Sequence, residues 1–120
     1  MTNENDVFDA LKYRVEVDEF GTRSHYNFDG KLHRVEGPAI VYTSGAQEWY
    51  QNGKLHRIGG PAAEWMDGTQ WWCQNGELHR EDGPAVVSGD GREQWFLTGA
   101  EFSKAGHRKI LKVLRHTNDI

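Results

Sequence analysis

The chain has 120 residues, the length of a single domain, and its formal net charge of −4 is unevenly distributed. Residues 1–102 carry 9 Lys/Arg against 17 Asp/Glu, whereas residues 103–120 carry 5 Lys/Arg against Asp119 alone. An acidic body excludes nucleic acid as a general partner, because phosphate contacts need a positive surface, and it leaves only the basic C-terminal segment suited to such contacts.

Cys73 is the single cysteine, which excludes an intramolecular disulfide. Residues 1–9 are polar and acidic, unlike a secretory signal. No apolar run approaches the ~20 residues that cross a bilayer. We therefore expect a cytoplasmic protein with no membrane span.

The N-terminal part precedes the regular pattern. Residues 1–12 are expected to form a separate segment with a helical turn that covers the first edge of the following sheet. Residues 13–17 alternate like a strand, and Phe20-Gly21 follows as a turn. We interpret this stretch as a degenerate first repeat, so that the repeat array spans residues 13–102.

A period of 23 residues governs the chain from residue 30 onward. Four glycines stand at this interval: Gly30, Gly53, Gly76 and Gly99. Leu-His-Arg and then Gly-Pro-Ala follow each of the first three, so three copies are complete and a fourth is truncated. A fixed period of this size indicates a repeat architecture.

Each period contains two turn signals, separated by segments rich in aromatic and β-branched residues. Asn-Gly and Asp-Gly pairs are typical of type I′ hairpin turns, in which both central residues have positive φ. One set is Asp29-Gly30, Asn52-Gly53, Asn75-Gly76 and the weaker Thr98-Gly99; the other is Ser44-Gly45, Asp67-Gly68 and Asp90-Gly91. Two strands per repeat follow, and the predicted fold is mainly β: an elongated antiparallel meander of β-hairpin repeats with a C-terminal capping helix.

Residues 103–120 form the predicted basic, amphipathic C-terminal helix. Ser103 is a suitable N-cap, and Ile110, Leu111 and Leu114 fall on one helical face. We expect this face to cover the open end of the sheet, as terminal units of repeat proteins do.

Two polar columns recur with the period. His33, His56 and His79 stand about 9–10 Å apart if they occupy alternate strands, too far to share a zinc ion, so we expect them to hydrogen-bond turn backbone. The second column, Arg34, Arg57 and Arg80, forms an anion-binding edge with these histidines in an alternative interpretation. Arg57 is its best candidate, because no carboxylate lies near it in sequence.

The aromatic residues divide into recurring and individual ones. Trp49, Trp72 and Trp95, with Tyr26 before them, are expected in the core. Trp65 and Trp71 are individual to the second copy, and with Tyr50 and Arg57 they form the predicted protein-binding patch, since exposed aromatic and arginine side chains are typical of interface hot spots. The alternative is a filled second face under the helix.

No catalytic signature is present in the sequence. Cys73 occupies the position of Tyr50 and Phe96, which indicates a small hydrophobe rather than a nucleophile. We find no phosphate loop, catalytic triad or zinc motif, and we predict no enzyme activity, no cofactor and no metal.

The repeat resembles a known family. The run Trp49-Tyr50-Gln51-Asn52-Gly53-Lys54-Leu55-His56-Arg57 with Gly60-Pro61-Ala62 is similar to MORN repeats, and more closely to a MORN-related repeat in small phage and viral proteins. The resemblance covers about residues 13–107. It implies a run of β-hairpins that serves as a scaffold or interaction module.

The expected function is therefore a non-enzymatic protein-binding module, phage- or virus-encoded, that acts on a host protein in the host cytoplasm as an inhibitor or counter-defence factor. Two alternatives stay open: a binder of a small anion (nucleotide or phospholipid headgroup) along the His-Arg edge, and a structural virion component. Open sheet edges also suggest a homodimer formed by edge-strand pairing.

Overall fold

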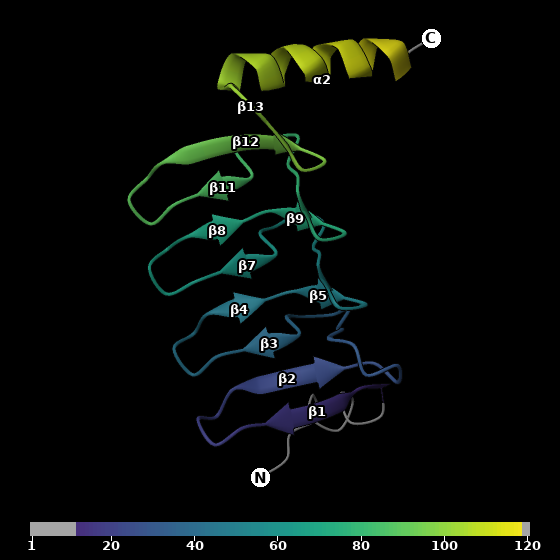
Figure 1. Cartoon of the computed structure of the whole chain (residues 1–120), viewed down its shortest axis with the longest axis vertical. Helices are drawn as coiled ribbons and strands as arrows, with labels where there is room; N and C mark the ends of the chain where they lie inside the picture. Colours follow the sequence, from purple (N-terminus) through teal and green to yellow (C-terminus); the bar gives the residue numbers. More distant parts are fainter. Residues whose placement is uncertain (1–11, 119–120) are drawn as a thin grey trace.

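The computed structural model of the chain describes residues 12–118, which form short antiparallel strands followed by a helix (Figure 1). The strands are β1 (Arg14–Val17), β2 (Arg23–Tyr26), β3 (Ile40–Val41), β4 (Gln47–Glu48), β5 (Tyr50–Gln51), β6 (Lys54–Leu55), β7 (Ala63–Glu64), β8 (Gln70–Trp71), β9 (Cys73–Gln74), β10 (Glu77–Leu78), β11 (Val86–Val87), β12 (Glu93–Leu97) and β13 (Ala100–Phe102). The helix is α2 (Lys104–Asn118). The helical turn expected within residues 1–12 lies, apart from Lys12, outside the described residues.

The strands form one long sheet and two short two-stranded sheets that lie beside it. Nine of them pair in the order β1-β2-β3-β4-β7-β8-β11-β12-β13, and every pair is antiparallel. The ribbons β5–β6 and β9–β10 lie beside this sheet, and α2 runs across the end that follows β13 (Figure 1). The predicted elongated, mainly β meander with a C-terminal helix is confirmed.

Residues 47–51 form two short strands, β4 and β5, that are divided at Trp49. Trp49 donates its backbone N–H to the carbonyl of Ala62, whereas its own carbonyl accepts the N–H of His56. The strand therefore changes partner at this residue, because residues 57–61 leave the ladder between the two pairings. The equivalent division recurs in the next repeat, so both repeats carry four short strands where we expected two.

We call the segments that leave the ladder the Arg–Pro loops: residues 34–38, 57–61 and 80–84. Each begins with an arginine and ends with a proline, two residues before a strand. Proline has no backbone N–H to donate, so it fits where pairing is interrupted.

The hairpin turns are of two kinds. Asn52, Asn75 and Thr98 have φ of 50°, 52° and 49°, and the glycine after each also has positive φ, as a type I′ turn requires. In the turns Ser44-Gly45, Asp67-Gly68 and Asp90-Gly91, only the glycine has positive φ. This is the pattern of a type I turn followed by a residue in the left-handed region. The type I′ prediction is therefore wrong for this second set and for Asp29-Gly30.

Each histidine of the recurring column holds the turn of the next repeat. The Nδ1 atoms of His33, His56 and His79 accept the backbone N–H of Asn52, Asn75 and Thr98 at 3.0, 3.0 and 2.8 Å. These are the residues whose positive φ an L side chain rarely adopts. The predicted hydrogen bond from histidine to turn backbone is confirmed, and it links residues 19 apart in every case.

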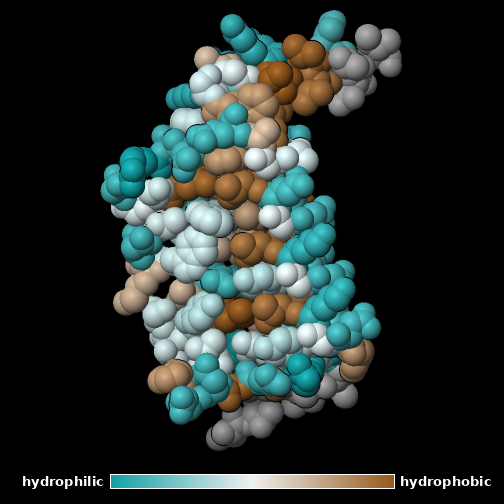
Figure 2. Space-filling view, viewed as in Figure 1, coloured by the Kyte–Doolittle hydropathy of each residue, from teal (hydrophilic) through white to brown (hydrophobic). Residues whose placement is uncertain are grey.

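The core is thin and periodic. Ala39, Ala62 and Ala85 are fully buried at the 23-residue interval, and the other buried apolar residues include Cys73 and Val86. Figure 2 shows hydrophobic patches along the middle of the molecule, flanked by hydrophilic residues. A pair of short strands with so little apolar surface is not stable alone, so neighbouring repeats stabilise one another.

The helix begins at the predicted N-cap. Ser103 Oγ accepts the backbone N–H of Gly106 at 3.0 Å. Leu111 is 6 % exposed, but Ile110 and Leu114 are 38 % and 50 % exposed. The prediction that all three cover the sheet is therefore wrong for two of them, because the helix lies on the sheet through the His107–Leu111 edge of its apolar arc.

The strained turn residue of the last hairpin leads to a testable prediction. Thr98 is β-branched and pays the larger steric penalty at positive φ, whereas asparagine tolerates this region. We expect Thr98→Asn to raise the free energy of unfolding by about 1 kcal/mol. The reciprocal change, Asn75→Thr, should lower it by a similar amount. Urea unfolding of both variants measures this, and a destabilised Thr98→Asn would contradict it.

Candidate functional site

Three half-buried aromatic side chains meet around one carboxylate on a face of the sheet. Trp65 Nε1 donates to Glu48 Oε2 at 3.0 Å, and the Tyr50 hydroxyl donates to Glu48 Oε1 at 2.9 Å. The rings of Trp65 and Trp71 meet edge to face, with centroids 5.1 Å apart and planes at 87°. We call Tyr50, Trp65, Trp71 and Glu48 the aromatic cluster.

The strand register explains why these residues meet. Glu48 pairs with Ala63, and Ala63 pairs with Trp71, so their side chains share one face. Tyr50 and Trp65 lie two residues from Glu48 and Ala63, which places them on the same face. Ala63 is fully buried and small, and this leaves room for the larger rings on both sides.

Burial keeps the two phenols near Glu48 protonated. Burial, reinforced by the Glu48 carboxylate, raises the pKa of Tyr50 well above its ordinary value. The same two causes raise the pKa of Tyr42, which lies near the cluster. Both phenols therefore remain protonated, and the Tyr50 hydroxyl continues to donate to Glu48.

Arg57 does not belong to this cluster, contrary to the predicted patch. Its guanidinium lies 3.9 Å from the centre of the Trp49 ring. Trp49 lies between Glu48 and Tyr50 in sequence, so its side chain is on the opposite face of the sheet. The structure thus brings Tyr50, Trp65 and Trp71 together and separates Arg57 from them.

The three recurring arginines are held inside the Arg–Pro loops. Arg57 Nη1 and Arg80 Nη1 each donate to the carbonyl of the loop proline at 3.1 Å, and Arg34 Nη1 does so at 3.3 Å. Arg80 stacks on Trp72 at 3.7 Å, as Arg57 does on Trp49. In the folded chain, Glu64 Oε1 lies 3.8 Å from Arg57 Nη1. The two residues are not close enough in sequence for this pair to be expected.

Glycine in Gly-Pro-Ala has a steric role. A Cβ on Gly60 would lie 2.7 Å from Arg57 Cζ, and one on Gly83 would lie 2.8 Å from Arg80 Cζ. The guanidinium is therefore clamped between an indole ring and a bare backbone. Together with the histidine bonds to the turns, this engages Nη1 of each arginine and Nδ1 of each histidine of the predicted His-Arg edge in intramolecular contacts.

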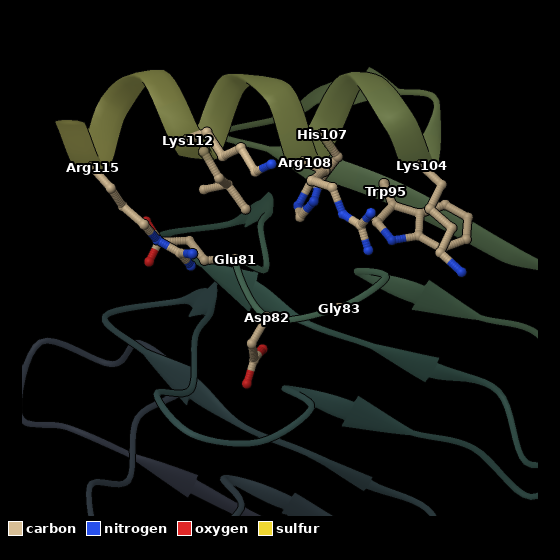
Figure 3. A pocket seen from close by; sticks show the side chains of 10 residues that line it. Glu81, Asp82, Gly83, Trp95, Lys104, His107, Arg108, Lys112 and Arg115 are labelled. Atoms are coloured by element: carbon tan, nitrogen blue, oxygen red, sulfur yellow. The ribbon is translucent and has the colours of Figure 1, made fainter. Parts of the chain in front are cut away.

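A cleft of about 400 Å³ separates α2 from residues 81–83 (Figure 3). Four cations line it from the helix: Lys104, Arg108, Lys112 and Arg115. Glu81 and Asp82 line it from the loop, where Asp82 is already paired with Arg80 at 2.9 Å. His107 Nε2 donates to the carbonyl of Arg80 at 2.7 Å and fixes the helix at this position.

Residues 12–118 contain neither an activated thiol nor a cluster of side chains suited to bind a metal ion. Burial raises the pKa of the Cys73 thiol to about 11, which keeps it protonated at neutral pH. No three His, Cys, Asp or Glu side chains of these residues are placed as metal ligands would be. In the same part of the chain, no helix has the length and apolar composition needed to cross a bilayer.

A scan against protein-family models finds no match, and neither does a search of curated proteins or of solved structures. The site therefore has to be interpreted from its own residues. Sequence reasoning missed Glu48 as its centre. The available signal was positional: Glu48 occupies the place of Trp71 one repeat earlier, so the two share a face of the sheet.

The clamp around Arg57 predicts a strong coupling between two substitutions. Gly60→Ala should displace the guanidinium and destabilise the fold by about 1–3 kcal/mol, as overpacking does. The same change in an Arg57→Ala background should cost at least about 1 kcal/mol less, because the clashing group is gone. Chemical denaturation of the four proteins gives the cycle, and strictly additive effects would disprove the clamp.

The buried thiol leads to a second prediction. With a pKa of about 11 against an ordinary value of 9.0, Cys73 in the native protein should react with a disulfide reagent at pH 8 at least about 100-fold more slowly than in the unfolded chain. Stopped-flow absorbance with and without denaturant measures both rates. Equal rates would show that the thiol is accessible.

Proposed function

We propose that this chain is a non-enzymatic protein-binding module and that the aromatic cluster is its recognition surface. The observation that carries the proposal is the Trp65–Trp71 pair, held by Glu48 at the centre of the sheet. Large aromatic side chains with fixed orientation lose little entropy when they bind a partner, and they dominate interface energetics.

The repeat itself does not require these two tryptophans. The third copy has Ser88 at the position of Trp65 and Gln94 at the position of Trp71, and its strands pair in the same way. The fold therefore forms without the aromatic pair. Met66, which follows Trp65 at the tip of its hairpin, is 79 % exposed and extends the apolar surface.

The contacts of the arginine and histidine columns favour this proposal over the anion-binding alternative. A guanidinium that stacks on an indole and donates to a proline carbonyl must lose these contacts before it can turn toward a phosphate. The expectations of a phage or viral origin, a host partner, a cytoplasmic location or a place in a virion rest on the resemblance alone and stay predictions.

The third copy also supplies the variant that tests the proposal. Trp65→Ser/Trp71→Gln installs residues that the same fold already accommodates, so the protein should fold. Affinity capture from the native cell, read by quantitative mass spectrometry, should show at least about a tenfold loss of the partner protein.

The matched control is Phe20→Ala/Phe28→Ala, which removes two exposed aromatic rings at hairpin tips outside the cluster. This control should capture the partner as the wild type does. Equal recovery of every protein by wild type and by the tryptophan double variant would refute the proposal, provided that thermal unfolding shows both to be folded.

A further inference from the structure

The helix α2 exposes a stripe of apolar side chains beside the edge that contacts the sheet. Leu111 is 6 % exposed, whereas Ile110, Val113 and Leu114 are 38 %, 62 % and 50 % exposed. Figure 2 shows this hydrophobic patch on the helix beyond the end of the sheet. At 100° per residue the three form one continuous stripe, the geometry of a helix that binds a partner along its length.

Basic side chains occupy much of the remaining helix surface: Lys109 lies beside the stripe, and the other four cations line the cleft that also contains Glu81 and Asp82. The helix contains no Asp or Glu, and its cations are Lys104, Arg108, Lys109, Lys112 and Arg115. Within residues 12–118, none of these five forms an ion pair, although cations elsewhere do so with Glu64, Asp82 and Asp90. Lys109 lies four residues before Val113, so the basic flank begins directly beside the stripe.

The stability of the helix accounts for Arg115, which lies in the last turn, but not for Lys104. Lys104 is in the first turn, where a positive charge opposes the helix dipole at a cost of about 0.3–1 kcal/mol. The first turn contains no acidic residue that would compensate. Lys104 lies over the Trp95 ring, with Nζ 5.8 Å from its centroid, but within residues 12–118 no carboxylate forms an ion pair with it or with the other four cations, so the helix is complementary to an acidic group from outside.

We propose that α2 docks an acidic amphipathic helix of a partner protein. The apolar residues of that helix cover Ile110, Val113 and Leu114, and its carboxylates lie against the flank that begins at Lys109. Burial of the stripe supplies affinity, and the charge pairs set orientation and association rate. This surface is separate from the aromatic cluster and does not depend on its role.

Charge also distinguishes this occupant from others. A second copy packed through α2 would place two sets of five cations together, which is unfavourable. A nucleic acid would use the cations and leave the apolar stripe in water, so it accounts for only half of the surface.

The test uses the full chain and synthetic helical peptides of about 20 residues, long enough to form a helix. The first peptide has leucine along one face and glutamate beside it. The second replaces every glutamate with lysine, and the third replaces every leucine with serine. Fluorescence anisotropy should show saturable, salt-sensitive binding of the first peptide alone.

Variants of the chain then locate the site. Ile110→Ser/Leu114→Ser and, separately, Lys109→Glu/Lys112→Glu should each weaken binding of the first peptide at least about tenfold. The control Val35→Ser/Ile58→Ser removes two exposed apolar side chains from the Arg–Pro loops and should change nothing. Circular dichroism confirms that each variant is folded.

Several results would overturn the proposal. These are no saturable binding of the acidic peptide, equal binding of the lysine peptide, or binding that neither α2 variant reduces. Sedimentation that shows a dimer of the free chain, abolished by Ile110→Ser/Leu114→Ser, would assign the stripe to a second copy. Binding of a DNA duplex in place of the acidic peptide would assign the cations to nucleic acid.

Discussion

A hydrogen bond from each turn to the histidine of the preceding repeat connects the repeats along the chain. The backbone at Asn52, Asn75 and Thr98 has positive φ, and its N–H points to an imidazole 19 residues earlier. Because the bond spans two repeats, it fixes their register as well as the shape of the turn. Short strands with a thin core depend on such repeated links, since no single repeat buries enough apolar surface to fold alone.

The recurring and the individual residues therefore have different roles. Histidine recurs because each repeat needs its hydrogen bond to the next turn. Arginine and tryptophan recur because the guanidinium stacks on the indole ring, and the glycine of Gly-Pro-Ala recurs because a Cβ there would clash with that guanidinium. Trp65, Trp71 and the apolar stripe of α2 do not recur, and the framework forms without them in the other copies. A repeat scaffold of this kind separates stability from recognition, so that binding residues can differ between copies while the fold stays the same.

Much of this architecture is predictable from the sequence, because a 23-residue period with two turn signals constrains a chain strongly. The hairpin stack, the histidine bonds and the Ser103 cap follow from local chemistry. The wrong predictions about the binding patch and the helix have one common cause, which is that sequence does not say which side of an element is covered. The predicted grouping of Arg57 with Trp65 is wrong because the Arg–Pro loop folds the Arg57 side chain onto the other face of the sheet. Ile110 and Leu114 share an apolar arc with Leu111, but periodicity does not show that the sheet covers only half of that arc.

The most direct test of this account is amide hydrogen exchange measured residue by residue by NMR. The amides of Asn52, Asn75 and Thr98, which donate to histidine, and those of Arg57 and Arg80, which donate to the next repeat, should all be protected. Protection should recur every 23 residues, while the amides of Ser44, Asp67 and Asp90 at the tips of the other hairpins exchange freely. If the three turn amides exchange as fast as those tips, the histidine bonds do not connect the repeats and the account is wrong.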